Sequence, residues 1–313
     1  MPSPRSYRYR VVDVFTTQPL EGNPLAVFPE ASGLDDVTMQ KIAREMNLSE
    51  TVFVVPATRA SLAAGVRIFT PTRELPFAGH PTVGTSFVLL DEGTVPAGTK
   101  QFVLEEKVGP VAIRVEQGRV ETGERPLIWL TTPPISYGRT YDRLRCAQAL
   151  GVAAHDLLDI TPQWLSAGNP TVFIALRDRR AVDDAWLDSH GVSIIKGADA
   201  APICVFVFTP APEGAYARMF APEYGVPEDP ATGSSTGPLA AFMIRHRLVS
   251  GAAGTRFVSE QGTKMGRQSF VHIELAYPRQ GDFPSRIEVG GSVVPTLTGE
   301  LAGGWEDQDR VTQ

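Results

Sequence analysis

An internal repeat with a period of about half the chain is the feature that most limits how this sequence can fold. Four anchors recur in the same order in both halves: a Gly-Asn-Pro turn before an apolar run (22–28 and 168–174), an Asp-Asp pair (35–36 and 183–184), an apolar run followed by an Arg-x-Phe segment and a polar turn (52–85 and 205–234), and a Phe-Val pair (102–103 and 257–258). Four matches in one order favour a duplicated unit. The length of 313 residues also fits two lobes that each bury a core.

Each half shows the order strand, helix, strand, strand, helix, strand, which indicates a mixed α+β fold. The first helix is predicted to begin after Asp35, to bury Met39, Ile42, Ala43 and Met46, and to end at Asn47. In the second half the Asp-Asp pair at 183–184 is expected to open a helix. We expect an N-terminal lobe over 7–155, with a crossover from the C-terminal end possible, a C-terminal lobe over 156–302 and a tail over 303–313.

Two polar turns are expected to begin the second helix of each half. Pro81 suits the first helical position, so His80 should lie at a helix N-terminus, with Val83, Phe87 and Leu90 facing inward. The repeat places Asp229 in the same way. Two helix N-termini that face one cleft would bind a carboxylate or an enolate through free N–H groups. The neighbouring small residues would let a ligand approach the backbone closely; they are Gly79, Gly84, Gly233, Ser234 and Ser235.

Composition and motifs argue against several classes of protein. The net charge of −6 and the lack of a Lys/Arg cluster disfavour nucleic acid as a partner. No apolar stretch is long enough to span a membrane and no signal peptide is evident, so we expect a cytoplasmic protein. The five histidines are scattered and no Gly-rich phosphate motif occurs, which predicts neither a metal nor a cofactor. Cys146 and Cys204 are interpreted as buried thiols.

Glu50 is the first candidate for acid–base chemistry, because it precedes the apolar run Val-Phe-Val-Val. A carboxylate at the mouth of a buried strand loses hydration, which raises its pKa toward the range of a general base. No acid occurs at the expected counterpart around Pro202 and Ile203. His80 could relay a proton or cap its helix, and Asp229 could cap its helix or face a ligand.

The sequence blocks around these residues resemble the phenazine-biosynthesis PhzF-like family, which has the diaminopimelate epimerase fold. The resemblance runs from about 12 to about 299 and rests on EGNPLAVF, MNLSETVFV, FTPTRELPFAGHPTVG, FAPEYGVPEDPATGSS and SEQGTKMGRQS. It implies two pseudo-symmetric lobes, each a barrel-like mixed sheet around a central helix, with the site between them. It also implies a homodimer and a cofactor-free isomerase like those that act on trans-2,3-dihydro-3-hydroxyanthranilate.

By resemblance, the catalytic residues fall on Glu50, His80 and Asp229. The family's backbone contacts to a small-molecule substrate correspond to Gly79 and the Gly233-Ser234 turn. The sequence departs from the family pattern at Pro238, where the helix is expected to start late or kink, and at Gln268, where proline is common.

Other functions remain open on the same scaffold. A racemase with two catalytic cysteines would need thiols at both turns, which this chain lacks. The segment 233–237 satisfies the serine hydrolase motif G-x-S-x-G, but an Asp-Pro pair stands where a strand should lead into the serine. A non-catalytic binding protein and a cysteine-free epimerase or racemase are the remaining alternatives. The presence of all three polar residues favours an enzyme that moves a proton between carbons of a small carboxylate-bearing, cyclic amino acid-like substrate.

Overall fold

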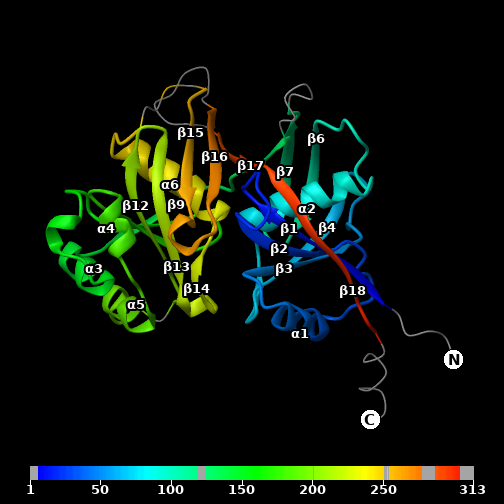
Figure 1. The fold of residues 1–313 in the computed structure, drawn as a ribbon, viewed down its shortest axis with the longest axis horizontal. Coiled ribbons are helices and arrows are strands. Elements are labelled where there is room, and N and C mark those ends of the chain that lie inside the picture. Colours follow the sequence, from blue (N-terminus) through cyan, green and yellow to red (C-terminus); the bar gives the residue numbers. More distant parts are fainter. Residues whose placement is uncertain are drawn as a thin grey trace, which may run out of the picture.

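Two lobes lie side by side in the computed structural model of the chain, and each is a curved sheet around one helix (Figure 1). The structure describes residues 6–118, 125–199, 201–249, 252, 254–276 and 286–303. Within these ranges, 18 strands form one hydrogen-bonded network. The predicted α+β fold with two pseudo-symmetric lobes is therefore confirmed.

The first lobe consists mainly of the first half of the chain. Its helices are α1 (Asp36–Met46) and the central α2 (Gly79–Asp91). Its strands are β1 (Tyr7–Val14), β2 (Asn23–Phe28), β3 (Glu50–Val55), β4 (Ala64–Phe69), β5 (Glu74–Leu75), β6 (Gln101–Glu106), β7 (Gly109–Glu116), β8 (Leu127–Thr131) and, from the far end of the chain, β18 (Val293–Leu301).

The second lobe carries more helices on its outer face. They are α3 (Arg143–Leu150), α4 (Arg179–Asp184) and α5 (Ser189–Lys196), while α6 (Gly233–Arg245) is central. Its strands are β9 (Ser136–Thr140), β10 (Gln163–Ser166), β11 (Thr171–Ala175), β12 (Cys204–Ala211), β13 (Gly214–Ala221), β14 (Val226–Asp229), β15 (Arg256–Gln261), β16 (Ser269–Ala276) and β17 (Arg286–Gly291). A 3-10 turn, η3 (Pro222–Tyr224), precedes β14.

The two sheets repeat the same pattern of strand pairing. In the first lobe β2 runs parallel to β3, β3 antiparallel to β4, and β4 parallel to β6. In the second lobe β11 runs parallel to β12, β12 antiparallel to β13, and β13 parallel to β15. This agreement supports the repeat predicted from sequence.

Strand register corrects one detail of that repeat. Leu25 pairs with Glu50, and Thr171 pairs with Cys204. Since Leu25 and Thr171 occupy the same place after the two Gly-Asn-Pro turns, Cys204 is the counterpart of Glu50, rather than Pro202 or Ile203.

The helices agree with the sequence only in part. Asp35 caps α1 by accepting from the Thr38 N–H, and Asn47 ends it with a φ of 50°, as predicted. Val83, Phe87 and Leu90 of α2 pack in the core as predicted, but burial is not confined to that stripe, because strands surround the helix and bury most of its 13 residues. Pro81 is its third residue rather than its first. No helix among the described residues is long and apolar enough to cross a membrane.

Three expectations for the second half need correction. The pair Asp183 and Asp184 ends α4, whose N-cap is Asp178, because that side chain accepts from a backbone N–H in the first turn. Asp229 ends β14 instead of beginning a helix. Helix α6 begins at Gly233 and contains Pro238, so it does not start late.

Chain crossings shift the expected boundary between the lobes. Strand β18 pairs with β1 in the first lobe, as the possible crossover suggested. Strand β9 pairs with β10, and α3 packs in the outer core of the second lobe with Leu150 and Cys146 buried (Figure 1). Residues 136–150 thus belong to the second lobe rather than to an N-terminal lobe ending at 155. Most of the expected tail, 304–313, lies outside the described residues.

Candidate active site

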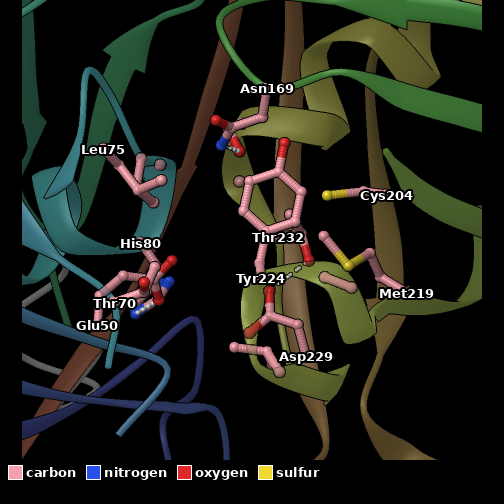
Figure 2. Close-up of a pocket in the computed structure, with 16 residues that line it drawn as sticks. Glu50, Thr70, Leu75, His80, Asn169, Cys204, Met219, Tyr224, Asp229 and Thr232 are labelled. Atoms are coloured by element: carbon pink, nitrogen blue, oxygen red, sulfur yellow. Dashed lines mark hydrogen bonds and ion pairs between the residues drawn. The ribbon is translucent and has the colours of Figure 1, made fainter. Parts of the chain in front are cut away.

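A pocket between the two lobes holds the three residues predicted to carry chemistry (Figure 2). It encloses about 40 Å³ of space open to water, which is room for a few ordered waters. Its lining residues are Glu50, Thr70, Leu75, Ala78, Gly79, His80, Asn169, Cys204, Met219, Ala221, Tyr224, Val226, Asp229, Thr232, Gly233 and Ser234. Glu50 and His80 come from the first lobe and face Asp229, Cys204 and Tyr224 of the second.

The N-termini of the two central helices meet at this pocket through glycines. A Cβ atom added to Gly79 would lie 2.5 Å from the Cα and C atoms of Gly233, and one added to Gly233 would lie 3.0 Å from the Cα of Gly79. The sequence suggested that these glycines give room to a ligand. In the structure the lack of a side chain at both positions also allows the backbones of α2 and α6 to come into contact.

Glu50 and His80 form the first-lobe wall of the pocket. Glu50 begins β3, and its Oε2 lies 3.4 Å from Nε2 of His80, which is 3% exposed. Neither atom has a hydrogen-bond partner in the part of the chain that the structure describes. Burial, with Asp229 nearby, raises the pKa of the Glu50 carboxyl well above its usual range, and burial lowers the pKa of His80 to about 3. Because burial favours the neutral form of each group, this contact is not an ion pair.

Asp229 lies at the end of β14, held by both lobes. Its Oδ1 accepts from Nδ2 of Asn23 at 2.8 Å, and its Oδ2 accepts from the Thr232 hydroxyl. Burial raises the pKa of Asp229 to about 6, although hydrogen bonds from Thr232, Asn23 and Ser49 oppose this rise. The carboxyl does not cap α6, whose first turn has no side-chain cap.

Asn23 is a residue of the site that the sequence reasoning missed. Its side-chain Nδ2 lies 3.1 Å from Nδ1 of His80, 2.8 Å from Oδ1 of Asp229 and 2.9 Å from the Ala231 carbonyl oxygen. The residue is completely buried. Its place in a repeated Gly-Asn-Pro turn was visible in the sequence, and that recurrence was the signal that could have identified it.

The second-lobe wall contains the remaining predicted residues and one that was not predicted. Ser234 lines the pocket and accepts from Nδ2 of Asn169 at 2.9 Å. Ser235 does not line it, because its hydroxyl is buried within 2.9 Å of the Thr171 hydroxyl. Cys204 is a free, buried thiol as expected, but it lies on the pocket wall. Burial raises the pKa of this thiol, so it is not a thiolate nucleophile.

Within the described part of the chain, the residues that line the pocket offer a small ligand two carboxyl groups, one neutral imidazole and no cation. A carboxyl group with a raised pKa is a stronger base when ionised than an ordinary carboxylate, and it can return the proton that it takes up. Among the described residues, no cluster of three or more His, Cys, Asp or Glu side chains could hold a metal ion. The two carboxyl groups and the imidazole can supply proton transfer and hydrogen bonds to a ligand in this pocket.

Comparisons with known proteins show the family to which the chain belongs. Residues 12–299 match the family described as phenazine biosynthesis-like protein. An uncharacterized isomerase of Mesorhizobium japonicum is 36% identical over 94% of this chain and 98% of its own length. The trans-2,3-dihydro-3-hydroxyanthranilate isomerase of Pseudomonas chlororaphis is 35% identical over 92% of this chain and 96% of its own. A Bacillus anthracis protein of the PhzF family shares the fold, with a TM-score of 0.84 and 20% identity over 95% of this chain and 99% of its own.

Proposed function

This chain belongs to the phenazine biosynthesis-like family and is an isomerase, and from that premise we propose that it moves a proton between two carbons of a small carboxylate-bearing, cyclic amino acid-like substrate without a cofactor. The observation that carries the proposal is the Glu50 carboxyl. Its Oε2 is buried at the pocket wall without a hydrogen-bond partner, and its pKa is raised well above the usual range.

Glu50 is proposed as the carrier of the proton. Its carboxylate removes a proton from one carbon, the electron pair shifts along the substrate, and the resulting carboxylic acid returns the proton to the second carbon. The cofactor-free step is balanced because one C–H bond breaks and another forms. A substrate that fills the small pocket would displace the water beside Glu50, which would favour return of the same proton.

His80 and Asp229 are proposed to orient the substrate. A pKa of about 3 keeps His80 neutral near pH 7, so its ring acts as a hydrogen-bond donor and not as a cation. The paired N-termini of α2 and α6 are suited to hold the substrate carboxylate, because each exposes backbone N–H groups and a partial positive charge.

Proton exchange in heavy water tests this function. The protein is incubated with cyclic amino acids and with trans-2,3-dihydro-3-hydroxyanthranilate, the substrate named for its relative, and carbon-bound deuterium is followed by NMR. We expect Glu50→Gln to slow transfer by about 10²–10⁴-fold, the usual contribution of a general base. Glu45→Gln, the same change on an exposed glutamate of α1, is the control and should react like the wild type.

Three outcomes would count against the proposal. Equal rates in the wild type and Glu50→Gln would remove Glu50 from the reaction. Inversion at a single carbon, without movement of a double bond, would instead support an epimerase. No turnover of any compound, together with tight binding in the pocket, would support a non-catalytic binding protein.

A further inference from the structure

Two asparagines occupy equivalent places in the two lobes, and each contacts the second residue of a central helix. Asn23 follows Gly22 and contacts His80 of α2, while Asn169 follows Gly168 and contacts Ser234 of α6. We infer that Asn23 and Asn169 are paired positioning residues that direct two hydrogens into the pocket, Nε2–H of His80 and Oγ–H of Ser234.

The first half of this inference follows from what surrounds Asn23. The Ala231 carbonyl oxygen can only accept a hydrogen bond, so the amide atom 2.9 Å from it must be Nδ2 and not Oδ1. The same Nδ2 lies 3.1 Å from Nδ1 of His80. A hydrogen on Nδ1 would point at an N–H donor, so neutral His80 carries its hydrogen on Nε2.

That hydrogen faces the pocket. Nε2 of His80 lies 3.4 Å from Oε2 of Glu50, and neither atom has another partner. A buried N–H without a partner is costly, which indicates that it is kept for a group that enters the pocket. An oxygen acceptor of the substrate, held beside Glu50, would satisfy it.

The second half follows from Asn169 by the same logic. One amide atom of Asn169 lies 2.9 Å from Oγ of Ser234 and 3.5 Å from the Phe77 carbonyl oxygen, and a neighbouring carbonyl oxygen favours Nδ2 over Oδ1 at this place. Nδ2 donates to Oγ of Ser234 at 2.9 Å, so the Ser234 oxygen acts as an acceptor and its own hydrogen must point elsewhere. Ser234 lines the pocket and is 3% exposed, and its hydroxyl donates no hydrogen bond within the described residues.

Together the two asparagines give the pocket one oriented donor on each lobe. This inference rests on the proposed function and sharpens its substrate class. A substrate should present one oxygen acceptor to His80 and another to Ser234, as a carboxylate with a carbonyl or enolate oxygen would. An ammonium group at either position would meet a donor and be rejected.

The hydrogen position on His80 can be read without any substrate. In protein labelled with ¹⁵N-histidine, long-range ¹H–¹⁵N correlation spectra separate the two neutral forms, and loss of one signal in His80→Gln assigns the residue. We expect wild-type His80 to carry hydrogen on Nε2 throughout pH 5–8. A hydrogen on Nδ1, or a protonated ring at pH 7, would overturn the inference even if the asparagine variants do not fold, and whether or not the isomerase function holds.

Matched variants then separate the two asparagines. Asn23→Ala should give a mixture of the two neutral forms at His80 and lower kcat by about tenfold, since one oriented hydrogen bond is lost. Asn169→Ala should leave the His80 spectrum unchanged and raise KM about tenfold. In a Ser234→Ala background, Asn169→Ala should add nothing, because the group it orients is gone. An unchanged His80 spectrum in Asn23→Ala, or additive losses at Asn169 and Ser234, would contradict the pairing.

Discussion

The two lobes present the same backbone to the pocket but different side chains. Both keep the Gly-Asn turn, the helix that begins with glycine, and an Arg–Glu pair that joins matching strands. Four equivalent positions differ in chemistry: Glu50 and Cys204, Leu75 and Asp229, His80 and Ser234, and Glu106 and Gln261. The difference teaches that the glycines, asparagines and Arg–Glu pairs that fix backbone geometry were kept in both halves, while these four pairs of side chains at or near the site diverged. Such asymmetry suits the single proton carrier proposed above.

The Arg–Glu pairs allow the strongest test of this comparison. Arg218 and Glu228 have side chains only 5% and 11% exposed, and Arg218 also donates to the carbonyls of Val182, Asp183 and Ala185. Arg218→Met would leave a nearly buried carboxylate unpaired, so we expect a loss of about 3–5 kcal/mol in the free energy of unfolding.

The matched substitution in the first lobe should lower the free energy of unfolding far less. Arg67→Met breaks a pair with Glu74 in which the arginine is 29% exposed, so we expect a loss of about 1 kcal/mol. Urea denaturation of both variants measures the two values. Equal losses would mean that the two pairs are equivalent in energy as well as in position.

Substitutions at the two glycines where the central helices meet should also lower stability by different amounts, but the difference should be smaller than for the two arginines. Gly79→Ala places a Cβ atom 2.5 Å from the backbone of Gly233, and we expect overpacking to cost about 3 kcal/mol. Gly233→Ala places its Cβ 3.0 Å from Gly79 and Phe15, and a smaller shift should limit the cost to about 1 kcal/mol. Thermal or urea unfolding would contradict this prediction if Gly233→Ala were the more damaging change.

Glu106 in the first lobe and Gln261 in the second are equivalent buried residues, but only the glutamate can titrate. The comparison tests whether the acid makes stability depend on pH. Gln261 donates to the Asp229 carbonyl and to Thr232, whereas Glu106 accepts from Thr82 and has its other oxygen unpartnered. Burial raises the pKa of Glu106 from its ordinary 4.5 to about 8. Between these two pH values the folded protein keeps a proton that the unfolded chain has released, so stability falls as pH rises.

Glu106→Gln should remove this part of the pH dependence. We expect the variant to gain stability over the wild type from about pH 4.5 to 8, with a difference that grows by up to about 1.4 kcal/mol per pH unit. Urea unfolding of both proteins at pH 5, 6.5 and 8 measures this difference in the free energy of unfolding. Because both proteins contain Glu50 and Asp229, the contributions of these two residues cancel in the difference. Parallel pH profiles for the two proteins would show that Glu106 does not titrate in this window.

Much of the fold and site could be predicted from the sequence because local signals were strong. The Asp35 cap and the apolar spacing of α1 defined that helix, and the repeat brought Glu50, His80 and Asp229 to one expected cleft, where the structure does place them together. The counterpart of Glu50 was misplaced because 203–208 is a continuous apolar run buried on both faces. Without alternation, nothing local sets the register.

Other errors came from contacts between distant residues. An Asp-Pro pair before a helix fits a helix cap as well as a strand end, and only the pairing of Met219 with Asp229 decides for the strand. The boundary between the lobes was misplaced for a similar reason, since β9 follows β8 closely in the chain but pairs with β10. Asn23 was missed because its partners, His80 and Asp229, come from opposite lobes.

The pairing of β1 with β18 has a consequence for how the protein is made. Tyr7 is opposite Leu301, so one edge of β1 stays unpaired until β18 has been synthesised. The second lobe is built from strands that follow one another in the chain, β9 to β17, whereas the first lobe also needs β18 from far along the chain. Pairing across such a sequence distance slows folding and leaves an exposed strand edge in the meantime. Nascent chains that stop short of β18 should therefore depend on chaperones to protect the lobe that carries Glu50.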